Sequence, residues 1–222
     1  MRFSFYNPSY WVKSFIYSIL LSIISIQPAV SQNDADAQRI IDSFLNLAHS
    51  NVITARFTVS VIEKNGVNSY TNSGTFTLKG NRFVLEMQEM KVWFDGKTQW
   101  AYQKSGNEVT ITEPSVQELV QTNPMAILGN YRNKCNIRFC KTSSQLQCIQ
   151  LTPKLKKNED IAEIEVLLTK TDRIPQSITV SQKNGTRTVL MLSQFQKKAN
   201  VSEQIFTFDA KKYKDAYIND LR

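Results

Sequence analysis

Apolar side chains recur at every second position from residue 55 to residue 112, and tight turns interrupt the pattern at short intervals. In the first repeat Ala55, Phe57 and Val59 alternate with polar residues, and Asn65-Gly66 follows as a turn signal. A period of two places such side chains on one face of a β-strand, and short strands joined by tight turns form antiparallel hairpins. The pattern predicts six strands, over residues 55–61, 75–79, 83–88, 91–94, 98–104 and 107–112.

Helical patterns precede and interrupt these strands. Residues 34–51 carry a single apolar stripe at helical spacing, made of Ala37, Ile40, Ile41, Phe44, Leu45 and Ala48. Pro114 and Pro124 begin two short helices, predicted over residues 114–121 and 124–131. Strands are predicted to resume over residues 136–141, 146–151, 161–168, 174–182, 186–197 and 203–208.

About eleven or twelve strands with few helices predict an α+β fold. A sheet with this many antiparallel strands does not stay flat, because strand twist accumulates across it. We therefore expect a strongly curved sheet whose concave face is covered by the N-terminal helix and the short helical insert.

Residues 1–31 are predicted to be a signal peptide. Arg2 and Lys13 form a positive segment, an apolar run follows from Phe15 to Ile26, and 29–31 supply the small residues of a cleavage site. The alternative is a membrane anchor, but the run is shorter than the roughly 20 apolar residues that a spanning helix needs. Cleavage near Ser31 would export residues 32–222 to the periplasm as a single domain.

The charge of the exported chain is positive but dispersed. Without Arg2 and Lys13 the chain keeps 25 basic and 19 acidic residues, a net charge of +6. This excess favours solubility, and it also permits an acidic partner or an anionic membrane surface. Nucleic acid is not expected, because no recognition motif accompanies the charge.

Three cysteines leave two arrangements open. Cys140 and Cys148 flank a predicted hairpin turn, so a cross-strand disulfide would leave Cys135 over. Export permits a disulfide. Three reduced, buried thiols are the alternative, since cysteine often serves as a small buried hydrophobe.

Residue patterns typical of catalysis are absent from the sequence. The single histidine, His49, falls near the end of the first predicted helix, where a surface position is expected. No cluster has metal-ligand spacing, and there is no phosphate-binding loop or nucleophile elbow. We therefore expect a protein that is not an enzyme and holds no metal or cofactor. Periodicity alone does not distinguish a closed apolar core from an apolar cavity.

Four stretches resemble motifs of the periplasmic outer-membrane lipoprotein carrier family, the LolA-like proteins. Residues 74–83 resemble its GxxxxKxPxxF stretch, and residues 94–102 resemble its DGKxxWxY hairpin. Residues 123–128 are similar to its NPxxxL helix. Residues 206–209 with 220–222 resemble its FxF…DxR ending. The four stretches occur in the family's order, and the resemblance covers about residues 34–222.

The resemblance implies an unclosed β-barrel with helices as a lid over an apolar cavity. It also implies a monomeric carrier that takes lipid-modified proteins by their acyl chains from an inner-membrane exporter to an outer-membrane acceptor. A regulatory module on the same fold, which senses lipid or lipoprotein, is the alternative function. A hydrolase is a third reading, but it lacks a catalytic constellation.

Candidate lipid-binding residues come from three sources. Matched motif positions suggest Phe83, Leu85, Val92, Met125 and Leu128. Strand alternation adds Phe57, Phe76, Leu78 and Trp100. Phe44 and Leu45 would face the cavity from the N-terminal helix.

One position departs from the family pattern. The family often carries an arginine that bonds the lid backbone and stabilises the closed state, whereas this chain has Gly80 there. Arg82, two residues on, is the candidate substitute for gating the lid. If Arg82 does not take over this role, the closed state of the lid would be less stable and the lid would open more readily.

Overall fold

The computed structural model describes residues 32–222 except 116–117, 120–123, 142–143, 156–159 and 199–200. The predicted signal peptide and half of the predicted helix 114–121 therefore lie outside the described residues. Within them, the helices are α2 (Gln32–Ser50) and α4 (Pro124–Tyr131), with 3-10 helices η1 (Glu203–Phe206) and η2 (Ala210–Tyr213). The strands are β1 (Val52–Ile62), β2 (Asn68–Lys79), β3 (Arg82–Met87), β4 (Met90–Phe94), β5 (Gln99–Gln103), β6 (Glu108–Thr112), β7 (Cys135–Cys140), β8 (Leu146–Pro153), β9 (Ile161–Thr169), β10 (Pro175–Gln182), β11 (Arg187–Lys198) and β12 (Tyr217–Asp220).

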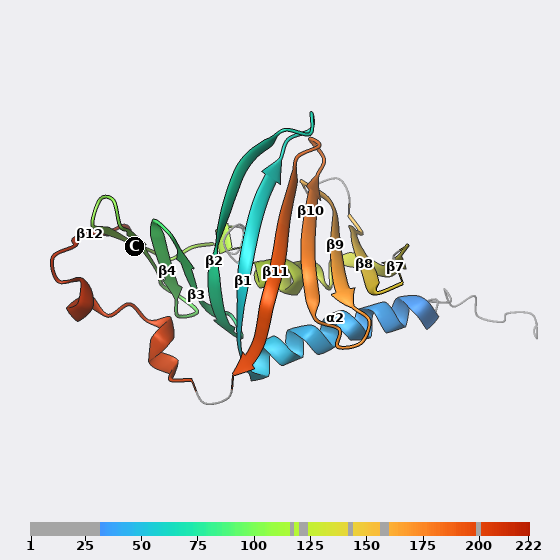
Figure 1. The fold of residues 1–222 in the computed structure, drawn as a ribbon, viewed down its shortest axis with the longest axis horizontal. Helices are drawn as coiled ribbons and strands as arrows, with labels where there is room; N and C mark the ends of the chain where they lie inside the picture. The colour runs from blue at the N-terminus through green and yellow to red at the C-terminus, as the bar shows by residue number, and fades with distance from the viewer. Residues whose placement is uncertain (1–31, 116–117, 120–123, 142–143, 156–159, 199–200) are drawn as a thin grey trace, which may run out of the picture. The chain divides into compact units, whose positions relative to one another are not determined.

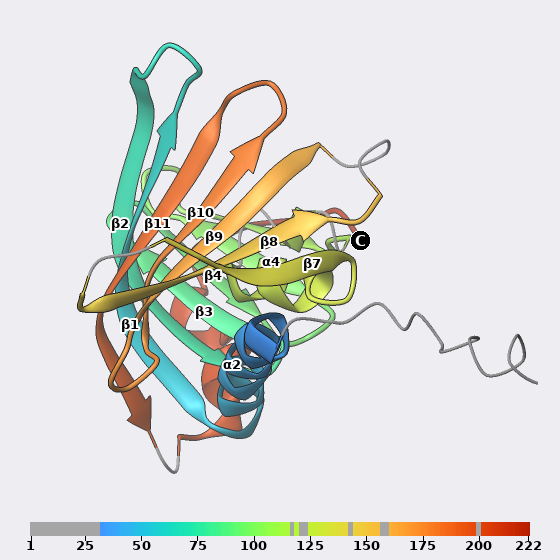
Figure 2. The ribbon, with the colours of Figure 1, turned by 90° about the vertical axis from the view of Figure 1, so that its right-hand side faces the viewer.

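All twelve of these strands form one sheet in the order β12-β6-β5-β4-β3-β2-β1-β11-β10-β9-β8-β7. Neighbouring strands are antiparallel except β12, which runs parallel to β6. The sheet curls strongly and stays unclosed, with β12 and β7 as its two edges (Figures 1 and 2). The strongly curved α+β sheet predicted from alternation and the unclosed barrel implied by the resemblance are therefore observed.

The apolar stripe predicted for residues 34–51 forms the buried side of α2. Ala37, Ile40, Ile41, Phe44 and Ala48 are each at most 5% exposed, and they share one apolar cluster with strand residues and with α4. We call the sheet face that carries Phe83 the inner face, and the opposite face the outer face. The helix therefore forms because its sequence supplies a stripe that the inner face can bury.

The outer face carries a second apolar region, which the C-terminal segment covers. Trp93 contacts the rings of Phe208 and Tyr213, with centroid separations of 5.5 Å each, and Tyr213 lies 4.6 Å from Tyr102. Burial of Tyr213 raises the pKa of its hydroxyl, and the nearby Tyr102 and Glu86 raise this pKa further. This outer aromatic cluster fastens residues 203–213 to β4 and β5, at the left of Figure 1.

The strand predicted over residues 203–208 is not observed. Residues 203–206 form η1 instead, because the Ser202 hydroxyl accepts a hydrogen bond from the Gln204 N–H and caps the turn. The alternating apolar residues of this stretch, Phe206 and Phe208, pack against the outer face without joining the sheet. The last strand, β12, was not predicted.

The cysteine question is resolved in favour of the disulfide. Cys140 and Cys148 lie directly opposite each other on β7 and β8, with their Cα atoms 5.1 Å apart, and they are bonded. Cys135 is buried at the other end of β7.

Replacing both bonded cysteines with serine should cost about 2.5 kcal/mol of unfolding free energy, as expected for a closed loop of this length. Urea unfolding measures the change, and reductant should lower wild-type stability to the level of the variant. Equal urea midpoints for the oxidised wild type and the variant would contradict this expectation.

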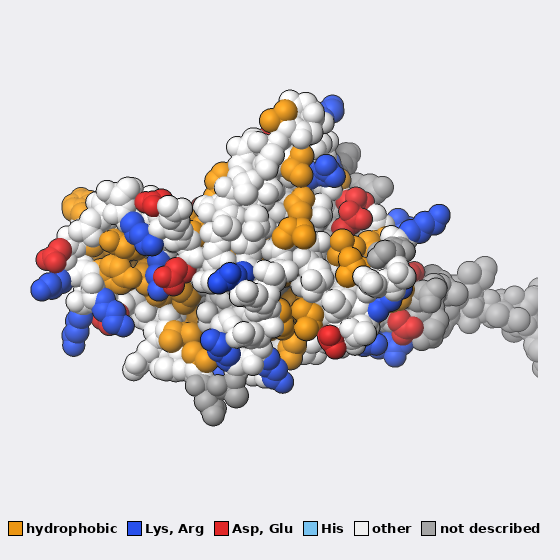
Figure 3. Space-filling view, viewed as in Figure 1, with side chains coloured by type: hydrophobic (Ala, Val, Ile, Leu, Met, Phe, Trp, Pro, Cys, Tyr) orange, Lys and Arg blue, Asp and Glu red, His pale blue; other side chains and the backbone are white. Residues whose placement is uncertain are grey.

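No helix among the described residues is long and apolar enough to span a membrane. Lys and Arg side chains are scattered over the face seen in Figure 3, with Asp and Glu among them. On that face the positive charge does not gather into one dominant patch.

Candidate functional site

The inner face of β1 to β4 forms a continuous apolar wall. Cross-strand pairing places Leu78 beside Phe83, and Leu85 between Phe76 and Val92. Phe83 also lies opposite Phe94, and their ring centroids are 5.3 Å apart. These side chains are buried and belong to the same cluster as the α2 stripe.

Two helices contribute to this cluster, together with strands β7 to β11. Phe44 of α2 is buried in it, and Leu45 packs against it while half-exposed. Leu128 of α4 is fully buried in it, and Ile127 is nearly so. The side chains of the wall and the helices thus meet through apolar contacts. Such contacts are non-directional and can be remade with another apolar group.

Most of the predicted lipid-binding residues meet in this cluster. Those placed in it or against it are Phe44, Leu45, Phe57, Phe76, Leu78, Phe83, Leu85, Val92 and Leu128. The side chain of Met125 lies outside the described part of the chain. The predicted residues that are placed in the cluster form one apolar surface, and their binding of lipid remains a prediction.

Trp100 does not belong with them, and its predicted position is corrected. It lies opposite Trp93 on β4 and opposite Ile111 on β6, so it sits on the outer face. Its inner-face neighbour on the strand is Ala101, which packs against the cluster. Alternation failed here because the bulky side chains of β5, Trp100 and Tyr102, lie on the outer face, whereas its inner face carries two glutamines and Ala101.

An ion pair that sequence analysis did not identify joins the two helices. The Arg132 guanidinium, just after α4, donates two hydrogen bonds to the Asp42 carboxylate of α2, one of them 2.5 Å long. These bonds raise the pKa of Arg132. Because the residues are 90 positions apart, no local pattern indicated this contact.

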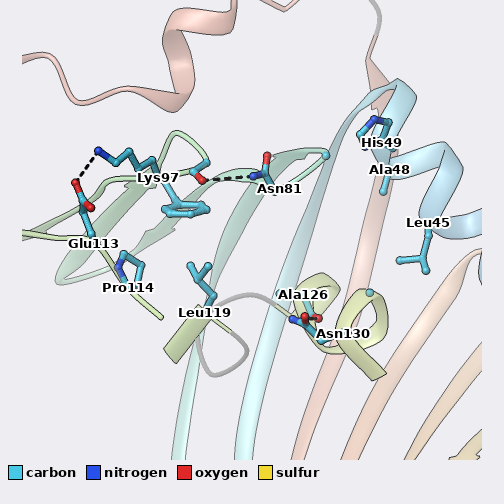
Figure 4. A pocket seen from close by; sticks show the side chains of 14 residues that line it. Leu45, Ala48, His49, Asn81, Lys97, Glu113, Pro114, Leu119, Ala126 and Asn130 are labelled. Atoms are coloured by element: carbon cyan, nitrogen blue, oxygen red, sulfur yellow. Dashed lines mark hydrogen bonds and ion pairs between the residues drawn. The ribbon is translucent and has the colours of Figure 1, made fainter. Parts of the chain in front are cut away.

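A pocket of about 730 Å³ opens beside the cluster. Its apolar lining includes Leu45, Phe94 and Leu119, and its polar lining includes Asn81 and Lys97. Figure 4 shows Asn81 and Lys97 on two strand turns, with His49 and Leu45 on α2 and Asn130 on α4 across from them. The volume falls in the range of roughly 300–1,000 Å³ that is typical of small-molecule sites.

Two turns of the sheet shape the rim of this pocket. The Asp95 carboxylate accepts hydrogen bonds from the Lys97 and Thr98 N–H groups and so fixes the β4–β5 turn. The Lys97 ammonium then lies 3.1 Å from the Glu113 carboxylate, which follows β6. The rim is therefore polar and the interior apolar, an arrangement suited to a ligand with a polar head and an apolar body.

One group among the described residues has metal-ligand geometry, namely Cys140, Cys148 and Glu165. Both sulfur atoms are consumed by the disulfide, so they offer no thiolate to a metal.

The family model for the outer membrane lipoprotein carrier protein LolA matches residues 28–185. The chain belongs to the LolA family. The match covers α2, the wall strands β1 to β4, α4 and most of the sheet, and it ends before the segment that forms the outer aromatic cluster. No curated protein matches the chain.

One solved structure shares the fold at low sequence identity, and others superpose with lower scores. An uncharacterized conserved protein from Thermus thermophilus superposes with a TM-score of 0.52 and 15% identity, covering 83% of this chain and 99% of that protein. A LolA superfamily protein from Nitrosomonas europaea gives a TM-score of 0.45 and 13% identity, covering 78% and 98%. A lipoprotein-sorting protein domain from Vibrio parahaemolyticus gives 0.45 and 13%, covering 82% and 100%.

This LolA-family chain uses Arg82 differently from the role expected for a lid-gating arginine. Arg82 pairs with Glu203 and lies 5.2 Å from the centroid of the Phe206 ring, on the outer face. It therefore contacts the C-terminal segment, and none of its described contacts is to α2 or α4.

The backbone conformation of Gly80 disfavours a side chain at the position where an arginine was expected. Gly80 has φ of +61°, which side chains rarely adopt, and an added Cβ would meet His49 Nδ1 at 3.4 Å. Its N–H donates a 2.8 Å hydrogen bond to the Ala48 carbonyl near the end of α2. Contact between the turn and α2 is thus made by the backbone of Gly80.

Proposed function

We propose that this protein is a non-enzymatic, exported carrier that holds the acyl chains of lipid-modified proteins and moves them from the inner to the outer membrane. The observation that carries the proposal is a continuous apolar wall that packs with α2 and α4 in one apolar cluster, beside a pocket with a polar rim. Membership of the LolA family supports the class of ligand.

The energetics of acyl chains require such a container. Exposing a chain to water costs about 0.8 kcal/mol for each CH₂ group, so a chain of about 16 carbons costs on the order of 12 kcal/mol. A carrier must cover this surface during transit and then release it. An apolar wall with replaceable covers does both, because contacts to the helices are exchanged for contacts to the acyl chain.

The helices α2 and α4 act in this proposal as a lid over the concave face. Acyl chains load at the pocket, displace Leu128 and its neighbours from the wall, and occupy the space between wall and helices. The Asp42–Arg132 pair keeps the two helices together, so they move as one unit. The loaded state is favoured only by the difference between acyl contacts and helix contacts, which keeps release possible.

Transfer between membranes tests the function. Donor vesicles carry a fluorescent triacylated lipopeptide, acceptor vesicles carry a quencher, and residues 32–222 are added in catalytic amount. The carrier should accelerate quenching in proportion to its concentration, while an equal amount of heat-unfolded protein should not. A transfer rate that is independent of the protein would contradict the proposal.

A further inference from the structure

The turn between β2 and β3 is held from both sides of the sheet. It consists of the consecutive residues Lys79, Gly80, Asn81 and Arg82, of which Lys79 and Arg82 are paired across the two strands. Lys79 and Arg82 point to the outer face, because their neighbours Leu78 and Phe83 lie in the inner cluster. Gly80 and Asn81 line the pocket.

On the outer face, both cations bind the same carboxylate. The Lys79 ammonium donates a 2.5 Å hydrogen bond to Glu203 Oε1, and Arg82 pairs with Glu203 Oε2. The hydrogen bond from Lys79, supported by Arg82, lowers the pKa of Glu203. We call Lys79, Arg82 and Glu203 the outer clamp. Phe206, which is 1% exposed, anchors η1 beside it.

On the inner side of the sheet, the same turn contacts the end of α2. The Gly80 N–H bonds to the Ala48 carbonyl, and the Asn81 amide lies 3.5 Å from the Gly96 carbonyl across the rim of the pocket. Only two residues separate the clamp cations, so movement of their backbone is passed directly to Gly80 and Asn81.

We propose that Glu203 is a positioning residue that holds the β2–β3 turn against the end of α2 and thereby sets how fast acyl chains load and leave. This inference rests on the proposed carrier function. Its basis is local: the clamp and the pocket rim share a four-residue backbone, and that backbone carries a described hydrogen bond from the sheet to the lid helix. Weakening the clamp frees the turn, and a freer turn lets α2 part from the sheet more often.

The test compares Glu203→Gln with the wild type in two measurements. Exchange of the Gly80 amide proton, followed by NMR in the empty protein, should be faster in the variant. Stopped-flow loading and release of a fluorescent fatty-acid probe should both accelerate by about two- to fivefold, the range that an exposed ion pair supports. Probe affinity should change little, because the apolar wall is intact.

Glu86→Gln is the matched control. Glu86 pairs with Lys91 on the outer face of the same sheet and is 54% exposed, close to the 51% of Glu203, but it does not touch the turn. It should leave both measurements unchanged. Lys79→Gln removes one of the two cations that bind Glu203 and should change both measurements in the same direction as Glu203→Gln, but by less.

The two measurements test the role of the outer clamp and the carrier function separately. Gly80 exchange that is the same in Glu203→Gln and wild type would overturn the inference, even if the wild type carries lipid normally. Faster exchange with unchanged loading and release would also overturn it. A wild type that binds no probe would contradict the carrier function, and Gly80 exchange would still decide whether Glu203 holds the turn.

Discussion

Phe83→Ala is expected to lower acyl-probe affinity by about tenfold to a hundredfold, because it removes a large side chain from the centre of the wall. Phe83 is 2% exposed and contacts Phe94 on the next strand. Its truncation should also cost about 3–5 kcal/mol of unfolding free energy. Probe titration and urea unfolding measure the two effects, and Phe83→Leu gives a milder version if the alanine variant is too unstable.

Trp93→Ala is the control variant, which distinguishes an effect of the inner wall on probe affinity from a general effect of lower stability. Trp93 is 5% exposed on the neighbouring strand, but it belongs to the outer aromatic cluster. Its truncation should destabilise the protein by a similar amount and leave probe affinity nearly unchanged. If both variants lost affinity in parallel, binding would follow overall stability and the inner wall would have no special role.

Leu128→Ala should have effects of opposite sign on stability and on binding. Leu128 is fully buried on α4, so the truncation should cost about 2–5 kcal/mol of unfolding free energy. Probe affinity should nevertheless rise, by about tenfold if a third to a half of that cost comes from weakened contact between lid and wall. An acyl chain that replaces Leu128 no longer competes with a full side chain.

Leu151→Ala is the control for this prediction. Leu151 has the same residue type and burial and lies in the same cluster, but on strand β8. It should lose stability without gaining affinity. Lower affinity in Leu128→Ala, to the same extent as in Leu151→Ala, would mean that α4 is part of a fixed core.

Much of the fold follows from the sequence because two periods, two and 3.6, mark the strands and α2 clearly. The wall was predictable for Phe76, Leu78 and Phe83, whose strands have polar outer partners. Trp100 was misplaced because the bulky side chains of β5 lie on its outer face, and nothing local shows that a segment about 100 residues later covers that face.

Contacts between distant residues were the other part that sequence reasoning missed. Arg82 was expected at the lid, but its partner Glu203 lies in a stretch that was predicted as a strand. The Asp42–Arg132 pair joins two helices across 90 positions. Whether Cys140 and Cys148 pair depends on the β7–β8 register, which spacing alone left open.

Native mass spectrometry of residues 32–222 with a triacylated lipopeptide tests the carrier proposal most directly. The deacylated peptide serves as the matched ligand, because it differs only in the acyl chains. A one-to-one complex with the acylated peptide alone is the predicted result. Binding of neither peptide, or of both equally, would contradict the proposal, because the apolar interior would then be a closed core.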